Sequence, residues 1–307
     1  MRAVVFAYHN VGVRCLSVLL SHGVDVKLVV THADNPRENI WFESVERLAR
    51  LHELPVAIVE DPNDPAFVQQ LAQQAPDFLF SFYYRHMLKP AVLAVAKLGG
   101  LNMHGSLLPN YRGRAPVNWA VIRGEKQTGA TLHYMIERPD AGDIVAQQAV
   151  PILPDDTAFD VFGKVTLAAE IVLDGVLPSL LNGSAPRIAQ DLRSGSYFGG
   201  RKPEDGRIDW NTGAATIHNL VRGVAPPYPG AFSDIAGKHV RILRSALTTA
   251  TPPRTAVPAL FCHAGRCYAE CADGNVLRIH CMEVDGRMFT SSNFERAGTT
   301  ARVPLPL

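Results

Sequence analysis

Residues 98–109 read Leu98-Gly99-Gly100-Leu101-Asn102-Met103-His104-Gly105-Ser106-Leu107-Leu108-Pro109, and this stretch decides the fold prediction. A short apolar run gives way, around Asn102 and His104, to a loop rich in glycine and proline. That change predicts a buried strand with polar side chains at its carboxyl end. Ligands bind at this edge of open α/β sheets, so the segment predicts both a strand and a site.

Outward from this segment, β-branched and aromatic runs alternate with amphipathic stretches through the first 190 residues. Strands are expected at 3–7, 26–31, 56–59, 78–82 and 101–104, and helices at 13–21, 42–52, 65–74 and 90–96. This alternation predicts crossover connections and a Rossmann-like, mostly parallel sheet covered on both faces. A hairpin-like strand pair at 131–135 and 144–150 and a long helix at 157–181 are expected to complete this α/β domain.

The composition changes after residue 190. Residues 191–203 contain Ser194-Gly195-Ser196 and Gly199-Gly200-Arg201, a composition typical of a linker. A short helix near 214–224 and several short strands broken by glycine follow, which predict a small β-barrel. We therefore expect a first domain over 1–190, a linker over 191–203 and a second domain over 204–307.

The overall composition is that of a globular protein. The chain has 307 residues, 47% hydrophobic and 19% charged, with a formal net charge of +1, so nothing in its charge calls for nucleic acid or an acidic membrane. No apolar run approaches the roughly 20 residues of a membrane span. Met1-Arg2 leads directly into an expected strand instead of a signal peptide. We expect a cytoplasmic protein with no membrane insertion.

Two cofactor classes are not expected. The five cysteines are an odd number without an export signal, which favours reduced thiols, and Cys262, Cys267, Cys271 and Cys281 form no Cys-x-x-Cys pair, so no metal site is predicted. The segment after the first strand, residues 8–12, has one glycine where a dinucleotide-binding fingerprint has three, so a nicotinamide cofactor is not expected either.

The predicted site brings together three kinds of side chain: an amide, an imidazole and a carboxylate. Asp140 follows His104 by 36 residues, in Pro139-Asp140-Ala141-Gly142. Taken singly, Asn102 could be a strand-end cap, His104 an ordinary core or surface histidine and Asp140 a turn former. Taken together they can hold an oxyanion, move a proton and fix the charge state of the imidazole, which predicts an acyl-transfer site.

The sequence around these residues resembles the 10-formyltetrahydrofolate-dependent formyltransferases. The likeness covers most of the first 230 residues, in segments 4–9, 31–36, 80–86, 102–119, 138–147, 198–201 and 226–232. The pattern Asn-x-His-x-Ser-Leu-Leu-Pro points to the superfamily as a whole. Tyr111-Arg112-Gly113-Arg114-Ala115-Pro116 and Phe82-Tyr83-Tyr84-Arg85-His86 favour its sugar-nucleotide branch, closest to the polymyxin-resistance formyltransferases that act on UDP-4-amino-4-deoxy-L-arabinose in lipid A modification.

The resemblance implies an OB-like fold for the second domain and a role for each site residue. Asn102 would donate its side-chain amide to the oxyanion, and protonated His104 would support that charge and deliver a proton to the departing folate nitrogen. Asp140 would favour the charged imidazole and orient it. The resemblance assigns contacts with 10-formyltetrahydrofolate to His86, Met87, Leu88, Arg114, Ile136, Glu137, Arg138, Pro139 and Asp140. Arg112 is an equal candidate for the role of Arg114.

The acceptor is less fully defined. Arg201 and Tyr228 are the candidates for binding the diphosphate and the base of a sugar nucleotide. Formylation of a dTDP-linked amino sugar or of methionyl-tRNA is an alternative, and a non-catalytic sugar-nucleotide or folate binding module is an alternative of a different class. In the resembling branch the formyltransferase is fused to a decarboxylating dehydrogenase. Here that activity is expected outside this sequence, on a separate polypeptide or a further domain, or else the pathway differs.

Overall fold

The computed structural model describes residues 1–249 and 257–306, which form two units. The first unit comprises Met1–Pro116, Gln127–Pro151 and Phe162–Gly199. The second comprises Val117–Lys126, Ile152–Val161 and Gly200–Leu307. Both units are therefore built from segments that are not contiguous in the sequence.

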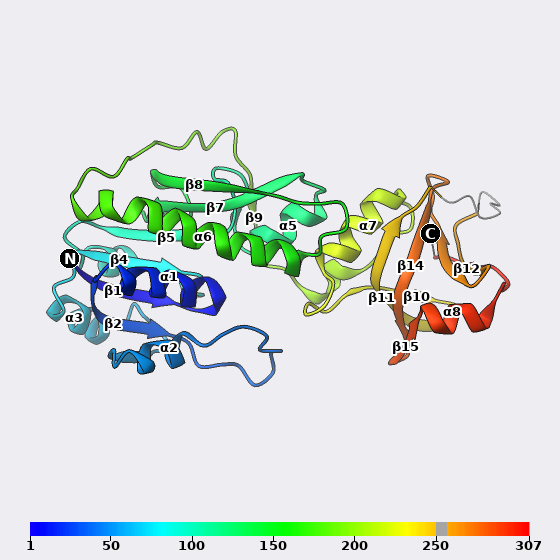
Figure 1. Ribbon diagram of the computed structural model, residues 1–307, viewed down its shortest axis with the longest axis horizontal. Coiled ribbons are helices and arrows are strands. Elements are labelled where there is room, and N and C mark those ends of the chain that lie inside the picture. Colours follow the sequence, from blue (N-terminus) through cyan, green and yellow to red (C-terminus); the bar gives the residue numbers. More distant parts are fainter. Residues whose placement is uncertain (250–256, 307) are drawn as a thin grey trace. The chain divides into compact units, whose positions relative to one another are not determined.

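The first unit is organised around a seven-stranded sheet of order β3-β2-β1-β4-β5-β7-β8 (Figure 1). Five strands are parallel: β1 (Arg2–Ala7), β2 (Asp25–Thr31), β3 (Val56–Ile58), β4 (Phe78–Phe82) and β5 (Gly100–His104). The last two, β7 (Gln127–Tyr134) and β8 (Ile144–Pro151), are antiparallel. The prediction of a mostly parallel α/β sheet is confirmed.

Helices cover both faces of this sheet. Alternate β1 residues, Val4 and Phe6, pack against α3 (Pro65–Gln73) and α4 (Pro90–Leu93), as expected of a strand buried on both sides. On the other face α1 (His9–Ser21) and α6 (Ala158–Leu181) run across the sheet (Figure 1). An ion pair between Arg14 and Glu170, at 2.6 Å, joins the two helices. The short helix α2 (Val45–Leu51) packs against α1.

A small two-stranded sheet adjoins the loop that follows β5. Its strands, β6 (Arg112–Gly113) and β9 (Tyr197–Phe198), pair in parallel. Part of the segment predicted as a linker is therefore hydrogen-bonded to the first unit. The 3₁₀ helix η1 (Pro203–Gly206) follows.

The second unit is an antiparallel, curled half-barrel of OB-like form. Its sheet has the order β10-β11-β14-β13-β12-β16, and β15 pairs with β14. The strands are β10 (Ala231–Ile235), β11 (Lys238–Leu247), β12 (Ala259–His263), β13 (Arg266–Glu270), β14 (Val276–Val284), β15 (Arg287–Thr290) and β16 (Val303–Pro304). Helix α7 (Ala214–Gly223) packs on β11, while α5 (Pro116–Ile122) and α8 (Ser291–Ala297) are the remaining helices of the described residues.

The core of this half-barrel includes Trp210. Its indole is fully buried and donates a 3.0 Å hydrogen bond from Nε1 to Ser233 Oγ. Across residues 1–249 and 257–306, no helix combines the length and the hydropathy needed to cross a membrane.

Candidate active site

The pairing of β5 with β7 places the predicted site on one face of the sheet. Asn102 and His104 are two residues apart on β5, so their side chains point to the same side. In the antiparallel register Asn102 lies opposite His133 of β7, and His104 lies opposite Thr131. Amide and imidazole groups from both strands therefore gather on one surface.

The loop that follows His104 is held by side chains of β7 and β8. The Thr131 hydroxyl donates to the Ser106 carbonyl at 2.6 Å and accepts the Leu108 N–H at 3.1 Å. Gln147 Nε2 donates to the Leu108 carbonyl at 2.9 Å. These bonds satisfy buried backbone groups of an irregular segment, and they fix the path of the chain away from His104.

His104 is buried, with 6% of its surface exposed, and both ring nitrogens face oxygen atoms. Its Nε2 lies 2.8 Å from the Tyr111 carbonyl, and its Nδ1 lies 3.5 Å from Asp140 Oδ1. A carbonyl oxygen can only accept, so Nε2 carries a proton. The Nδ1 atom then faces a carboxylate, and both contacts are attractive when the ring carries two protons.

Asp140 connects three parts of the site. Its Oδ1 lies 3.5 Å from both His104 Nδ1 and His133 Nε2, and its Oδ2 accepts the Gly113 N–H at 2.8 Å. Burial acts to raise the pKa of this carboxyl, but the two histidines and the Gly113 N–H outweigh burial and hold the pKa well below its usual range. Asp140 is therefore a carboxylate at neutral pH.

The turn that carries Asp140 is unusual and well supported. Asp140 has a φ of 51°, in the left-handed region that aspartate tolerates better than most residues. Gln190 Nε2 donates to the carbonyls of Asp140 and Gly142, at 3.1 and 2.6 Å. The structure thus brings Asn102, His104 and Asp140 together in one cluster, in which His104 is buried and the other two are half-buried.

Two members of this cluster were missing from the sequence-based site. His133 contacts Asn102 and Asp140, and Gly113 donates to Asp140. A histidine in an otherwise apolar strand at 131–135 was the available signal for His133. Its relevance depends on the β5–β7 register, which the local sequence does not reveal.

Apart from Arg114, the predicted folate residues occupy two segments of the first unit. His86 and Met87 are exposed after β4, the parallel neighbour of β5, whereas Leu88 is 6% exposed and belongs to the hydrophobic core. Ile136 to Arg138 are exposed and Pro139 is half-buried, immediately before Asp140. The side chain of Leu88 is thus committed to packing, which leaves its backbone for a ligand.

The two loop arginines differ in exposure. Arg112 is buried, at 6% exposed, and its Nε has no hydrogen-bond partner, whereas Arg114 is exposed. Their backbone N–H groups both pair with the β9 segment, Arg112 with the Ser196 carbonyl and Arg114 with the Phe198 carbonyl. Arg114 is the one whose side chain reaches solvent.

Arg201 and Tyr228 lie together in the second unit. The guanidinium carbon of Arg201 is 5.2 Å from the centroid of the Trp119 ring, and its buried Nη1 has no hydrogen-bond partner. Burial lowers the pKa of Arg201, while Asp205 and Tyr228 act in the opposite direction. Burial raises the pKa of Tyr228 to about 12, although Asn118 and Arg201 partly counteract it.

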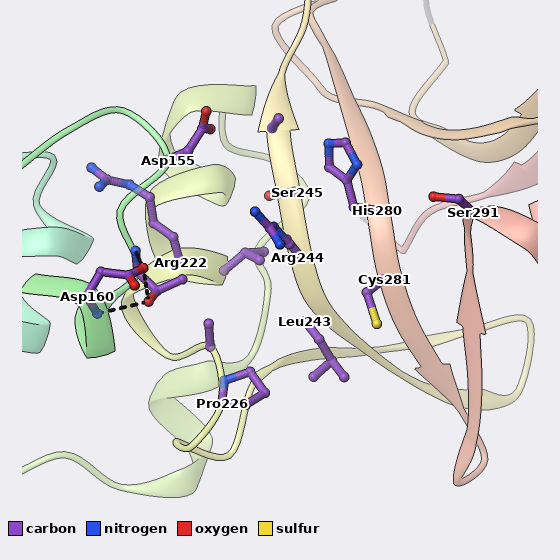
Figure 2. Close-up of a pocket in the computed structure, with 14 residues that line it drawn as sticks. Asp155, Asp160, Arg222, Pro226, Leu243, Arg244, Ser245, His280, Cys281 and Ser291 are labelled. Carbon is purple, nitrogen blue, oxygen red and sulfur yellow. Dashed lines mark hydrogen bonds between the residues drawn. The ribbon is translucent and has the colours of Figure 1, made fainter.

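A separate cavity of about 770 Å³ lies within the second unit (Figure 2). Arg222 and Asp160 lie on one side of it, and Arg244 and His280 lie on β11 and β14. Arg222 is part of the cavity wall, and its guanidinium is held there by a 3.2 Å hydrogen bond to the Leu153 carbonyl. All predicted catalytic and folate residues belong to the first unit, so this cavity is not their site.

Within the described part of the chain, no group of three or more His, Cys, Asp or Glu side chains is arranged to hold a metal ion. The cluster presents an amide, an imidazole and a carboxylate. Groups of these kinds can stabilise an oxyanion and transfer protons.

The sequence matches two domains of one family: the formyl transferase domain over residues 4–177 and the formyl transferase C-terminal domain over residues 201–294. The chain belongs to the formyl transferase family, and it is an enzyme of that class.

Solved structures of similar fold include three informative relatives. An N-formyltransferase from Helicobacter canadensis, in complex with folinic acid and dTDP-3-aminofucose, has 20% identity and a TM-score of 0.71, covering 91% of this chain and 98% of its own. A sugar N-formyltransferase from a Shewanella species has 19% identity and a TM-score of 0.63, and the match covers 82% of this chain and 99% of that one. HypX from Aquifex aeolicus, in complex with tetrahydrofolic acid, has 17% identity and a TM-score of 0.65, covering 100% and 51%.

Proposed function

We propose that this formyltransferase moves the formyl group of 10-formyltetrahydrofolate to the amino group of a sugar nucleotide. The observation that carries the proposal is the position of His104. Its two nitrogens lie between the Tyr111 carbonyl and the Asp140 carboxylate, on the sheet face that also bears Asn102. This arrangement supports a role for His104 as a proton donor on the sheet face that carries the Asn102 amide, and formyl transfer needs both groups.

The reaction needs an uncharged amine, which attacks the formyl carbon and forms a C–N bond. The carbonyl oxygen becomes an oxyanion, to which Asn102 donates an N–H. Collapse of this intermediate breaks the bond to the folate nitrogen, which takes a proton from the imidazolium of His104. The attacking nitrogen then gives its extra proton to the neutral imidazole, so the enzyme returns to its starting state with tetrahydrofolate and a formamide as products.

The contacts of His104 indicate which nitrogen serves the substrate. The bond from Nε2 to the Tyr111 carbonyl, at 2.8 Å, is short and occupied. The 3.5 Å separation of Nδ1 from Asp140 Oδ1 is long for a hydrogen bond, and the same oxygen also lies 3.5 Å from His133. We therefore assign proton transfer to Nδ1 and orientation of the ring to Nε2.

Exposure and charge support the residues proposed to contact the folate and the sugar nucleotide. Met87 and Ile136 are large apolar side chains that are 56% and 48% exposed, which suits packing against a pterin ring. Arg114 is exposed and can pair with a carboxylate of the folate. The unpartnered Nη1 of Arg201, with Trp119 and Tyr228 beside it, suits an anionic diphosphate and a stacked base.

The proposed acceptor is UDP-4-amino-4-deoxy-L-arabinose, because segments 82–86, 111–118 and 226–232 resemble the branch that uses it. A dTDP-linked amino sugar is the second candidate, supported by the ligand of the Helicobacter canadensis relative. Residues 201–307 hold 13 Lys and Arg against 9 Asp and Glu, a mild excess that argues against a tRNA acceptor.

The test is a purified-enzyme assay with 10-formyltetrahydrofolate and three kinds of acceptor at one salt concentration. We expect kcat/KM for the UDP-sugar to exceed that for dTDP-linked amino sugars at least tenfold, a difference of about 1.4 kcal/mol, with methionyl-tRNA inert. A dTDP-sugar that matches the UDP-sugar contradicts the acceptor assignment alone. Absence of turnover with every amino sugar contradicts the proposed function and favours a tRNA acceptor or a binding module.

A further inference from the structure

We infer that His133 is a positioning residue, which holds the side-chain amide of Asn102 with its nitrogen directed toward the reacting oxygen. The inference rests on the proposed function, because it gives Asn102 the role of oxyanion donor. His133 itself is 1% exposed on β7 and lies opposite Asn102 in the β5–β7 register.

The proton positions on His133 follow from its neighbours. Its Nδ1 lies 2.9 Å from the Tyr134 carbonyl, which can only accept, so Nδ1 carries the proton. In the neutral ring Nε2 is then an acceptor. The Nδ2 of Asn102 lies 3.1 Å from this Nε2 and donates to it.

This hydrogen bond decides which end of the Asn102 amide faces the substrate. An asparagine amide can turn over at low cost, which exchanges its oxygen and its nitrogen. With the oxygen turned toward Nε2 of neutral His133, two acceptors would face each other, so the contact selects the opposite orientation. One N–H of Asn102 Nδ2 is used by His133, and the second N–H on the same atom remains for an oxyanion.

The charged groups that face His133 are Asp140 and His104. Asp140 Oδ1 is 3.5 Å from His133 Nε2, farther than Asn102 Nδ2 at 3.1 Å. His104 shares the same carboxylate oxygen through its own Nδ1. Asn102 Nδ2 is thus nearer to Nε2 than Asp140 Oδ1 is, so the geometry favours the Asn102 amide as the partner of the Nε2 lone pair.

Two substitutions separate positioning from packing. His133→Asn retains an amide group near the position of Nδ1, so it can keep the bond to the Tyr134 carbonyl, but it is too short to reach Asn102. His133→Gln places an acceptor oxygen near the position of Nε2. We expect kcat to fall about 10- to 100-fold in His133→Asn, with KM for donor and acceptor changed less than threefold, and to fall less than fivefold in His133→Gln.

The Asn102→Ala background provides the decisive control. If His133 acts through Asn102, adding His133→Asn to Asn102→Ala should change kcat by less than twofold. If the double variant instead loses kcat by the product of the two single losses, the inference is overturned. A His133→Asn enzyme with wild-type kcat overturns it as well. Equal losses in His133→Asn and His133→Gln that parallel a fall in melting temperature show a structural role and also overturn it.

A spectroscopic readout requires no acceptor, so it separates this inference from the proposed function. The side-chain amide signals of Asn102 are assigned in ¹⁵N-labelled enzyme by their loss in Asn102→Ala. We expect one amide proton to be shifted downfield in the wild type and in His133→Gln, and to return toward the free-amide position in His133→Asn. Signals that are the same in all three proteins contradict the inference, whatever the acceptor is.

Discussion

The backbone N–H of Gly113 donates to the Oδ2 atom of Asp140 at 2.8 Å. Gly113 can make this contact because it has a φ of 98° and because its Cα lies against the chain of β9. A Cβ atom added to Gly113 would lie 2.1 Å from the Phe198 carbonyl oxygen. The placement of the Asp140 carboxylate therefore depends on a position that only glycine can occupy without strain.

Gly113→Ala should separate β6 from β9 and weaken the hold on Asp140. We expect a loss of about 1–3 kcal/mol in the free energy of unfolding and a fall of at least tenfold in kcat. Gly199→Ala is the matched control, because a Cβ there meets no atom within 4 Å. Urea unfolding and steady-state kinetics of both variants test this, and a Gly113→Ala enzyme equal to Gly199→Ala would contradict it.

Asp140→Asn should lower activity at neutral pH, since it removes the carboxylate beside His104.

Asp140→Asn should also change how the free energy of unfolding depends on pH. The pKa of Asp140 is depressed in the folded protein, so its contribution is fully present above the unfolded value of about 3.9 and is lost as pH falls through the lower, folded value. The difference in unfolding free energy between wild type and variant should shrink below about pH 4. Denaturant titrations from pH 7 to pH 3 measure it, with Asp25→Asn, an exposed site, as the control. A difference that is constant or grows on acidification would rule this out.

His104→Ala should abolish most formyl transfer while the protein remains folded. The side chain is buried, so some destabilisation is expected from the loss of its hydrogen bond to the Tyr111 carbonyl, on the order of 1–3 kcal/mol. The lost proton donor should cost at least 100-fold in kcat. Thermal unfolding and a formyl-transfer assay on the same preparation distinguish the two effects. A folded variant with near wild-type turnover would show that the assigned mechanism is wrong.

Arg201→Ala should weaken binding of the sugar nucleotide and leave the chemical step intact. Removing the guanidinium that lacks a partner at Nη1 takes away a charged donor for a diphosphate. We expect KM for the acceptor to rise at least tenfold, with kcat and KM for the folate within threefold. Arg207→Ala removes an exposed arginine paired with Asp234 and serves as the control. Equal acceptor KM values in the two variants would exclude Arg201 from the nucleotide site.

His9 should make folding sensitive to mild acid. Burial against Phe42, at a ring distance of 3.9 Å, and the charge of Arg85 lower the pKa of His9 to about 3. The folded protein then favours the neutral ring. The contribution of His9 to the free energy of unfolding is therefore complete above its unfolded pKa of about 6.5. It declines as pH falls toward 3, by at most about 1.4 kcal/mol per pH unit. His9→Asn tolerates the φ of 69° and should flatten stability between pH 6.5 and 4, unlike His52→Asn at an exposed site. If the free energy of unfolding has the same pH dependence in wild type and in His9→Asn, this prediction is refuted.

Local sequence patterns were sufficient for the sheet and for part of the site. Apolar runs flanked by loop residues predicted β1 to β5, and the two-residue spacing of Asn102 and His104 puts both on one face. The contacts of His133 and Gly113 depend on the β5–β7 register and on the β6–β9 pairing, which join residues about 30 and 85 positions apart. Several short elements were not predicted, because tertiary packing determines them more than local propensity does: the strands β6, β9, β12, β15 and β16 and the helices α5 and α8.

The pairing of β6 with β9 also bears on how this enzyme can be rebuilt. Residues 191–203 look like a convenient place to join the N-terminal half of one relative to the C-terminal half of another. Tyr197 and Phe198, however, form the strand that pairs with Arg112 and Gly113, beside the Tyr111 carbonyl that contacts His104. A chimera joined before Tyr197 would bring in a foreign strand beside the segment that holds the Asp140 carboxylate, whereas one joined after Gly199 would keep the parental pairing intact.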